Sequence, residues 1–341
     1  MDAQQQKRLL WQVPFLAFLI IGTVLIIRQQ QNMPYHKCAD FVFGTTFSVS
    51  YQSDSDMTYS IKDALRKVDY SLSPFNKESV ITAINNNQDV KPDKMFMDVY
   101  QMAMKVSQET DGAFDITVAP LVNAWGFGFK HGEKPTARQV DSLRQIIGYQ
   151  KVSVSGGKIR KQDPRMMLDC SAIAKGYGTD VVANLLRSYG VKNFMVEIGG
   201  EIVTSGVNPD RLPWKVGVIK PSDDSLSVSH ELQTILNVTD VAMATSGNYR
   251  NFYYEGGKKF AHTIDPLTGY PVQHSILSAT VFAKSCAIAD AYATSFMVMG
   301  LERAQQVLAR HPELMAYFIY DDAKGGNAVW FSPSLKNKIA D

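Results

Sequence analysis

Apolar residues are distributed along this chain of 341 residues in blocks of changing spacing, and the first block is the longest. It runs almost without interruption from Leu9 to Ile27 and directly follows Lys7 and Arg8. About 19 residues at a helical rise of roughly 1.5 Å each nearly span the core of a bilayer. Because no small-residue cleavage pattern follows the run, residues 1–33 are predicted to be a cytoplasmic tail and an uncleaved signal anchor.

After the anchor, helical spacing of apolar residues recurs several times. It predicts amphipathic helices near residues 61–68, 95–106, 136–147 and 287–299. A capping box formed by Thr136 and Gln139 is expected to open the third of these helices, and Gly148 is expected to end it. The fourth is predicted to be the last clear helix of the chain and to stop at Gly300.

Alternating apolar and polar residues predict strands between these helices. One strand is expected at 41–51, and two hairpins at 152–161 and 194–205 would each turn at a Gly-Gly pair. We therefore interpret residues 34–341 as one compact α+β body in which mixed or antiparallel sheets are flanked by helices.

Composition limits the classes of function. The chain carries 35 basic and 33 acidic residues, so its formal net charge is +2, and no basic patch indicates a nucleic-acid binder. A small molecule is therefore the default ligand. Cys38, Cys170 and Cys286 match neither zinc nor disulfide spacing, and we interpret them as small buried apolar residues.

The stretch at 168–180 combines an acid, a hydroxyl, a lysine and two glycines just ahead of a predicted helix. Gly176 and Gly178 would let a ligand approach the backbone, and Lys175 would supply a positive charge. This pattern is typical of a phosphate or metal-phosphate site, but an ordinary strand-to-helix turn has the same features. No Walker pattern is present, which disfavours a P-loop nucleotidase.

A second cluster lies on the predicted helix at 287–299. Asp290 and Thr294 are four residues apart and therefore share one face of that helix. One carboxylate and one hydroxyl suit Mg²⁺, which prefers oxygen ligands and usually keeps several waters. The alternative is that Asp290 only complements the helix dipole and that Thr294 is a buried polar neighbour.

Between these two clusters, a tight Asp-Pro-x-Thr-Gly turn at 265–269 follows a strand-like segment. His262 lies just before this turn. A histidine that titrates near neutrality can act as a general base, but a lone histidine can equally have a structural role.

Several short segments give a stronger signal together than any of them gives alone, because of their order along the chain. They are Gly44-Thr45-Thr46, Ser73-Pro74-Phe75-Asn76, Ile84-Asn85, Asp111-Gly112-Ala113-Phe114-Asp115, Ala172 with Lys175-Gly176-Tyr177, Gly199-Gly200-Glu201, Ser246 to Arg250, His262 to Gly269, and Ala289-Asp290 with Thr294. This series resembles the ApbE family of bacterial FAD:protein FMN transferases over nearly the whole chain after residue 40. The resemblance implies a T-fold-like catalytic body that transfers FMN from FAD to a threonine or serine hydroxyl of a partner protein, releases AMP and requires Mg²⁺.

The resemblance also implies roles for matching residues of this chain. Mg²⁺ would be bound by the backbone carbonyl of Ala172 and by the side chains of Asp290 and Thr294. We assign deprotonation of the acceptor hydroxyl to His262, and we expect Lys175 or Arg250 to offset charge on the pyrophosphate. The flavin and adenine groups of FAD, which is the substrate, would lie against Phe43, Phe75, Ala113, Phe114, Asp115, Asp169, Lys175 and Ile264.

Three positions depart from the common family pattern. Phe43 lies where methionine is frequent, Phe75 where tyrosine or tryptophan is common, and Ala293 where some members carry aspartate. The leaner metal site that this implies leaves open an alternative activity, the Mg²⁺-dependent hydrolysis of FAD to FMN and AMP. A third alternative is a non-catalytic FAD-binding protein tethered to the membrane.

The resemblance and the predicted anchor together imply a location. The protein is expected in the bacterial inner membrane, with a single N-terminal anchor and its catalytic body on the periplasmic side. The implied acceptors are flavoprotein subunits of membrane redox complexes.

Overall fold

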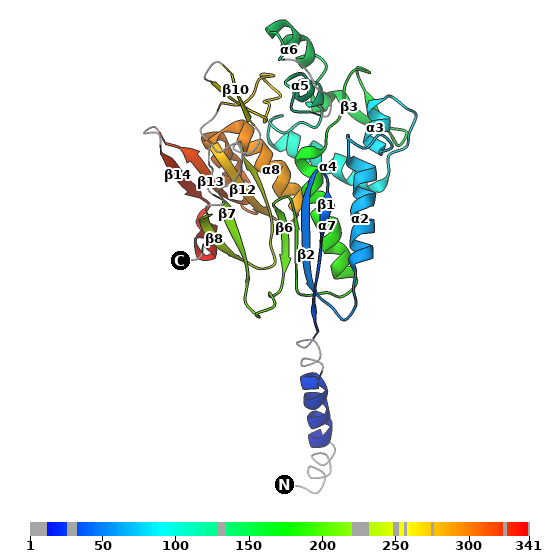
Figure 1. Cartoon of the computed structure of the whole chain (residues 1–341), viewed down its shortest axis with the longest axis vertical. Helices are drawn as coiled ribbons and strands as arrows, with labels where there is room; N and C mark the ends of the chain where they lie inside the picture. Colours follow the sequence, from blue (N-terminus) through cyan, green and yellow to red (C-terminus); the bar gives the residue numbers. More distant parts are fainter. Residues whose placement is uncertain are drawn as a thin grey trace.

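The computed structural model describes residues 12–25, 33–128, 134–219, 232–247, 252–255, 258–273, 276–322 and 326–339. Residues 12–25 are helical and are drawn in dark blue near the N terminus in Figure 1. Among the described residues, no helix combines the length and the apolar character that crossing a bilayer requires. The predicted anchor from Leu9 to Ile27 extends past this helix at both ends, outside the described residues.

An antiparallel sheet of eight strands forms the centre of the body, in the order β1-β2-β5-β6-β9-β12-β13-β14, and confirms the α+β class (Figure 1). Its strands are β1 Tyr35–Val42, β2 Thr45–Gln52, β5 Phe194–Ile198, β6 Glu201–Ser205, β9 Ala242–Gly247, β12 Ile276–Ala283, β13 Met315–Asp321 and β14 Asn327–Phe331. Three two-stranded ribbons pair β3 Val152–Ser155 with β4 Lys158–Lys161, β7 Trp214–Ile219 with β8 Leu232–Val238, and β10 Phe252–Glu255 with β11 Lys258–Ala261. The predicted hairpins at 152–161 and 194–205 are therefore confirmed as β3–β4 and β5–β6.

The strand predicted at 41–51 is part of a hairpin. β1 ends at Val42, β2 begins at Thr45, and Phe43 and Gly44 between them have φ values of 52° and 75°. These left-handed conformations match the twist of a two-residue hairpin turn, so the chain reverses where the prediction continued one strand. Glycine adopts such a φ at little cost, whereas Phe43 is strained by it.

Eight helices of the described chain pack around this sheet. They are α2 Thr58–Leu72, α3 Val80–Asn85, α4 Lys94–Glu109, α5 Ala119–Ala124, α6 Ala137–Arg144, α7 Ser171–Ser188, α8 Cys286–Met299 and α9 Leu301–Arg310, with 3₁₀ turns η1 Tyr149–Lys151 and η2 Pro333–Lys338. The helices predicted near 61–68, 95–106 and 287–299 are confirmed as parts of α2, α4 and α8.

Two helix predictions are wrong in their limits. The predicted capping box of Thr136 and Gln139 opens α6, but the helix ends at Arg144, before Gly148. The helix at 287–299 is also not the last one, because α9 begins directly after Gly300. Gly300, with a φ of 77°, is both the C-cap of α8 and the N-cap of α9. The prediction used this glycine only as the end of a helix and therefore missed the helix that begins after it.

The two faces of the sheet are covered by different layers. Ala244, Val281 and Phe318 project from one face into a core shared with α4, α8 and α9. Their sequence neighbours Met243, Phe282 and Tyr317 project from the other face against the β7–β8 ribbon and η2. This alternation, together with α7 packed on β5 and β6, places α7 and α8 side by side on the helical face (Figure 1).

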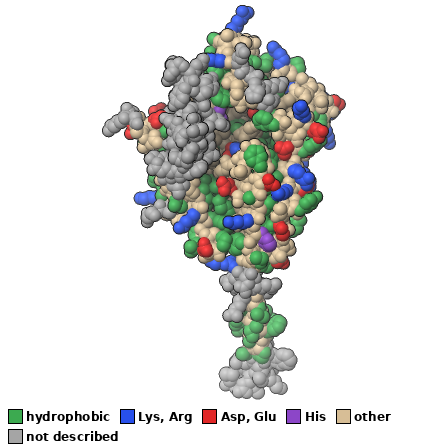
Figure 2. Space-filling view, in the orientation of Figure 1, with side chains coloured by type: hydrophobic (Ala, Val, Ile, Leu, Met, Phe, Trp, Pro, Cys, Tyr) green, Lys and Arg blue, Asp and Glu red, His purple; other side chains and the backbone are tan. Residues whose placement is uncertain are grey.

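The surface charges and the cysteines both bear on predictions made from the sequence. On the face shown in Figure 2, lysine and arginine are interspersed with aspartate and glutamate, without a continuous basic patch. Cys38, Cys170 and Cys286 are buried free thiols, as predicted.

Candidate functional site

The stretch at 168–180 is helical over most of its length, which corrects the prediction of a glycine turn ahead of a helix. α7 begins at Ser171, so Lys175, Gly176 and Gly178 already lie inside it. Neither glycine has a positive φ. The two glycines therefore do not form a loop around a phosphate.

The glycines instead allow two close contacts. A Cβ atom on Gly176 would lie 2.4 Å from the carbonyl oxygen of Cys286, the first residue of α8. A Cβ atom on Gly178 would lie 2.7 Å from Cε2 of Phe43, in the β1–β2 turn. Because the neighbour of Gly176 is backbone, a side chain there would push α7 and α8 apart.

The N-terminus of α8 is held by Asp180 of α7. The Asp180 carboxylate accepts hydrogen bonds from the backbone N–H groups of Cys286 and Ala287, both at 2.9 Å, and from Ser285 Oγ at 2.7 Å. These are donors that the first turn of a helix leaves unpaired. Gly176 and Asp180, one turn apart on α7, thus fix the position of α8 at the site.

Asp290 lies one turn into α8 and reaches back to α7. Its side chain is 2% exposed, and its Oδ2 accepts a hydrogen bond of 3.1 Å from the N–H of Gly176. In a regular helix this N–H donates to the carbonyl of Ala172, four residues earlier. The hydrogen bond to Asp290 therefore links its carboxylate to the turn of α7 that begins near Ala172.

Lys175 lies between two buried carboxylates. Its Nζ is 3.1 Å from Oε1 of Glu201 and 3.8 Å from Oδ2 of Asp290. Burial raises the pKa of both carboxyl groups, while the ammonium of Lys175 opposes that rise. Burial acts against the charged form of Lys175, but Asp290 and Glu201 outweigh it and raise the pKa of the ammonium, so Lys175 stays charged.

Thr294 follows Asp290 by one turn of α8 and contacts β9. Its Oγ1 lies 3.1 Å from Oγ of Ser246, so the two hydroxyls form a hydrogen bond. α8 packs on β9, and this packing brings the Ser246 hydroxyl next to Thr294. Ser246 is thus a further hydroxyl beside the predicted metal residues.

These oxygens match the ligand preferences of Mg²⁺. The predicted set consists of one carboxylate from Asp290, one hydroxyl from Thr294 and one carbonyl from Ala172, all hard donors of the kind that Mg²⁺ takes together with waters and phosphates. Across the described chain, no group of three or more His, Cys, Asp or Glu side chains is placed to hold a metal. The donor set fits Mg²⁺, whereas soft thiolate or multi-histidine sites for other metals do not occur in this part of the chain.

The segment that leads into α7 is held by two polar side chains. The amide of Asn85 donates to the carbonyl of Leu168 at 2.8 Å and accepts from the N–H of Leu168 at 2.7 Å. Asp169 Oδ1 accepts hydrogen bonds from the N–H and Oγ of Ser171 at the start of α7. Burial raises the pKa of Asp169. The predicted FAD residue Asp169 is therefore fixed against the N-terminus of α7.

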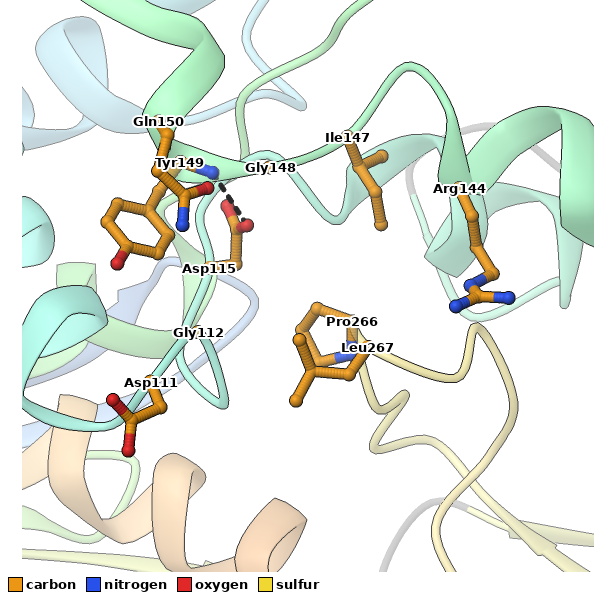
Figure 3. A pocket seen from close by; sticks show the side chains of 10 residues that line it. All are labelled: Asp111, Gly112, Asp115, Arg144, Ile147, Gly148, Tyr149, Gln150, Pro266 and Leu267. Carbon is orange, nitrogen blue, oxygen red and sulfur yellow. Dashed lines mark hydrogen bonds between the residues drawn. The ribbon is translucent and has the colours of Figure 1, made fainter.

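Asp115, another predicted FAD residue, lies at a pocket of about 250 Å³. Its carboxylate accepts from the N–H of Thr117 at 2.8 Å, from Oγ1 of Thr117 at 2.7 Å and from the N–H of Tyr149 at 2.8 Å. Figure 3 shows Asp115 and Tyr149 on one side of this pocket, with Pro266 and Leu267 facing them.

The remaining predicted residues are spread around these two regions. Ala113 and Phe114 are buried in the main core, and Ile264 packs in a second core with Trp125 and Val140. Phe75 is 69% exposed. Phe43 lies next to Gly178 of α7.

Of the predicted base His262 and the predicted cation Arg250, only His262 lies among the described residues. The ring of His262 contacts the ring of Phe127 edge-on, with centroids 6.5 Å apart. His262 follows β11 and precedes the tight turn in which the N–H of Gly269 donates to the carbonyl of Asp265. Arg250 lies outside the described residues.

A model of the ApbE family matches residues 43–318, which include both regions of the site. The chain belongs to the ApbE family. It is similar to the FAD:protein FMN transferase of Vibrio cholerae serotype O1, with 38% identity over 305 residues that cover 86% of this chain and 90% of the relative. The corresponding protein of Escherichia coli K12 is 32% identical over 298 residues, which cover 85% of this chain and 83% of the relative.

Solved structures of the ApbE family agree with the fold. The flavin transferase ApbE from Vibrio cholerae aligns with a TM-score of 0.80 and 34% identity over 90% of this chain and 99% of that one. The apo form of the flavinyl transferase ApbE from Pseudomonas stutzeri aligns with a TM-score of 0.80 and 27% identity, over 90% and 97% of the two chains.

Within this family fold, sequence reasoning gave Glu201 no role although its motif was recognised. Glu201 is 2% exposed and begins β6, where the buried Ile202, Val203 and Thr204 follow it. An acidic residue directly between a Gly-Gly turn and two apolar strand residues was the available signal. Its partner Lys175 could not be read from spacing, because the two residues are 26 positions apart along the chain and lie in different elements.

Proposed function

We propose that this member of the ApbE family is an FAD:protein FMN transferase that uses Mg²⁺ and attaches FMN to a threonine or serine hydroxyl of an acceptor flavoprotein. The relatives from Vibrio cholerae and Escherichia coli carry that name and match most of this chain. The resemblance of the site motifs supports the finer statements about Mg²⁺ and the acceptor hydroxyl.

The observation in the structure that carries the proposal is the surroundings of Asp290. This carboxylate is buried, accepts one hydrogen bond from Gly176, which lies one turn after Ala172 on α7, and lies one turn before Thr294 on α8. Burying a carboxylate costs several kcal/mol of folding free energy unless its charge is compensated. The ammonium of Lys175, which lies closer to Glu201 than to Asp290, is shared between two carboxylates, and this supports a further cation at Asp290. When bound there, Mg²⁺ would neutralise charge on the pyrophosphate and on the departing AMP.

The chain's own residues then position the substrate and move one proton. The acceptor hydroxyl oxygen forms a bond to the phosphorus of the FMN phosphate, the bond from that phosphorus to the AMP oxygen breaks, and His262 takes the hydroxyl proton. Lys175 offsets negative charge near the pyrophosphate. The pocket beside Asp115 and Tyr149 would accept one ring system of FAD.

One experiment tests the function directly. The purified full-length chain is incubated with FAD, Mg²⁺ and a flavoprotein subunit of a membrane redox complex, and the acceptor is then weighed by mass spectrometry. A mass gain equal to FMN on a threonine or serine, together with free AMP, is the expected result. Free FMN and AMP with every tested acceptor unmodified would identify an FAD pyrophosphatase instead, and FAD that stays intact would identify a binding protein.

The base assignment is tested in the same assay. His262→Ala should lower the rate of FMN transfer while FAD binding, followed by flavin fluorescence, is retained. An unchanged transfer rate in this variant would remove His262 from the mechanism.

We further propose that residues 1–33 tether the protein to the bacterial inner membrane and that its body lies in the periplasm. Support comes from the apolar run between Leu9 and Ile27 behind Lys7 and Arg8. Alkaline phosphatase fused to the C-terminus should be active in cells, and the fusion should sediment with membranes. Activity of a C-terminal green fluorescent protein fusion without phosphatase activity would place the body in the cytoplasm.

A further inference from the structure

The ammonium group of Lys175 is shared by two carboxylates that we expect to have different roles. Its Nζ is 3.1 Å from Glu201 and 3.8 Å from Asp290, and both carboxylates are 2% exposed. In the function proposed above, Asp290 is a ligand of Mg²⁺. An ammonium on Asp290 therefore competes with the cation for the same charge.

Glu201 is held firmly by the backbone around it. It directly follows the two-residue turn of the β5–β6 hairpin, where Ile198 pairs with Glu201 and the intervening Gly199 and Gly200 have φ values of 62° and 104°. The N–H of Gly199 donates to the carbonyl of Thr46 at 3.0 Å. The hairpin thus has no freedom to carry Glu201 away from α7.

The turn is also pressed against the Gly44-Thr45-Thr46 motif. A Cβ atom on Gly199 would lie 2.7 Å from the side chain of Thr45. Two sequence motifs without an assigned chemical role, this one and Gly199-Gly200-Glu201, therefore meet in space and together fix the carboxylate of Glu201. Lys175, by contrast, reaches the site through a long flexible side chain that is 28% exposed.

One oxygen of Glu201 has no partner. Oε1 faces Lys175, but Oε2 is buried and accepts no hydrogen bond from any described residue. A buried carboxylate oxygen without a donor lowers folding stability. Replacing both members of a buried ion pair by apolar residues often leaves stability unchanged or raises it, so the presence of the pair Glu201 and Lys175 here points to a role for its charges beyond stability.

We propose that Glu201 is a positioning residue that draws the ammonium of Lys175 away from Asp290 and so keeps Asp290 open to a divalent cation. In this arrangement Lys175 stays paired with Glu201, and the cation binds the neighbouring carboxylate of Asp290. The inference rests on the metal site of the proposed function and adds to it the residue that sets its affinity.

The test measures cation binding, independently of turnover. Mn²⁺ is titrated into the full-length protein without FAD, and free Mn²⁺ is counted by electron paramagnetic resonance. In Glu201→Gln, Asp290 is the one carboxylate of this pair that remains for Lys175. The ammonium then competes more strongly with Mn²⁺ for Asp290, so Mn²⁺ affinity should fall about tenfold. In the double variant Glu201→Gln with Lys175→Gln, no ammonium competes, and affinity should return at least to the wild-type value.

The controls separate this inference from the metal site itself. Asp290→Asn should abolish the binding that the wild type shows; a wild type that binds no Mn²⁺, or binds it equally well in Asp290→Asn, overturns the metal site and this inference with it. Normal wild-type binding with an unchanged affinity in Glu201→Gln overturns the inference alone. So does a double variant as weak as Glu201→Gln.

A purely structural ion pair predicts a different pattern. It would lower the thermal unfolding temperature of Glu201→Gln and of Lys175→Gln alike, and would leave Mn²⁺ affinity unchanged in both. Lys175→Gln alone also keeps the test valid if Glu201→Gln fails to fold. That variant should bind Mn²⁺ more tightly than the wild type, and equal or weaker binding contradicts the proposal.

Discussion

Asp115 and Asp290 are two buried aspartates with opposite surroundings. Asp115 accepts three hydrogen bonds, two from Thr117 and one from the N–H of Tyr149. Asp290 accepts one from the N–H of Gly176 and has the ammonium of Lys175 at 3.8 Å. Burial raises the pKa of both carboxyl groups, so burial alone does not distinguish them.

The difference between the two residues shows how a buried charge can be used. Both oxygens of Asp115 accept hydrogen bonds from its own chain. Its carboxylate joins the segment at 113–117 to the loop at Gly148 and Tyr149 and shapes the pocket wall. Asp290 accepts fewer hydrogen bonds, and in the proposed function its carboxylate binds Mg²⁺. We therefore expect removal of the first charge to affect folding stability, and removal of the second to affect chemistry.

The largest expected effect is on catalysis by Asp290→Asn. This change keeps the shape of the side chain and removes the charge that would bind Mg²⁺, which supplies several kcal/mol of transition-state stabilisation. The rate of FMN transfer at saturating Mg²⁺ should fall roughly 10²- to 10³-fold. The thermal unfolding temperature should stay equal or rise, because a buried charge has been removed. Full activity of Asp290→Asn would eliminate the metal assignment.

The next effect concerns the helix contact that delivers Asp290. Gly176→Ala places a Cβ against the Cys286 carbonyl oxygen, which is backbone and cannot rotate away. Overpacking of this kind costs about 1–3 kcal/mol or more, and the gain of about 1 kcal/mol in helix propensity offsets only part of it. Denaturant unfolding should show a net loss of stability, and Mn²⁺ affinity should fall because α8 is displaced.

Gly178→Ala is the matched control for that variant. It lies on the same helix, and its Cβ would meet the ring of Phe43, a side chain in a hairpin turn that can shift. We expect a smaller loss of stability than for Gly176→Ala, with Mn²⁺ affinity retained. Equal losses of Mn²⁺ affinity in the two variants would show that the α7–α8 contact does not position Asp290.

A smaller effect is expected from Asp115→Asn, and it should be on stability. An amide at this position offers one acceptor oxygen in place of two and turns an NH₂ group toward an existing donor, the N–H of Tyr149 or the hydroxyl of Thr117. The free energy of unfolding should fall by about 1–3 kcal/mol, measured by urea denaturation. Mn²⁺ affinity should be unchanged, and a loss of Mn²⁺ binding would contradict the contrast between the two aspartates.

The helices, the hairpins and the motifs were easier to predict from the sequence than the structural roles of the motif residues. Helices with strong apolar periodicity, such as α2 and α4, and hairpins that turn at Gly-Gly pairs were correct because local chemistry determines them. The β1–β2 reversal was missed because one of its turn residues is Phe43, a residue type that rarely takes a positive φ.

At the site, the sequence indicated Asp290, Thr294 and Lys175 but assigned Gly176 and Gly178 to a phosphate loop. Glycine has two uses, unusual φ and close approach, and only the structure distinguishes them. The role of Gly176 depends on Cys286, more than a hundred residues away, and that of Lys175 depends on Glu201. Contacts between distant segments of this kind carry no signal in local spacing.

The smallest effect belongs to the pocket region and tests a prediction made from local sequence alone. Thr136 caps α6: its Oγ1 accepts from the N–H of Gln139, and the side chain of Gln139 accepts from the N–H of Thr136. Thr136→Ala should lower the free energy of unfolding by about 0.5–2 kcal/mol. α6 carries Val140 and Arg144, which a Cβ on Gly269 would touch, so the cap supports the turn that brings Leu267 to the pocket. FAD should therefore bind slightly more weakly to Thr136→Ala, while Mn²⁺ affinity, set by α7 and α8, should not change. An equal drop in Mn²⁺ and FAD affinity would mean that the pocket at Asp115 and the site at Asp290 are not independent. The two aspartates would then belong to one coupled site, which contradicts the contrast between them.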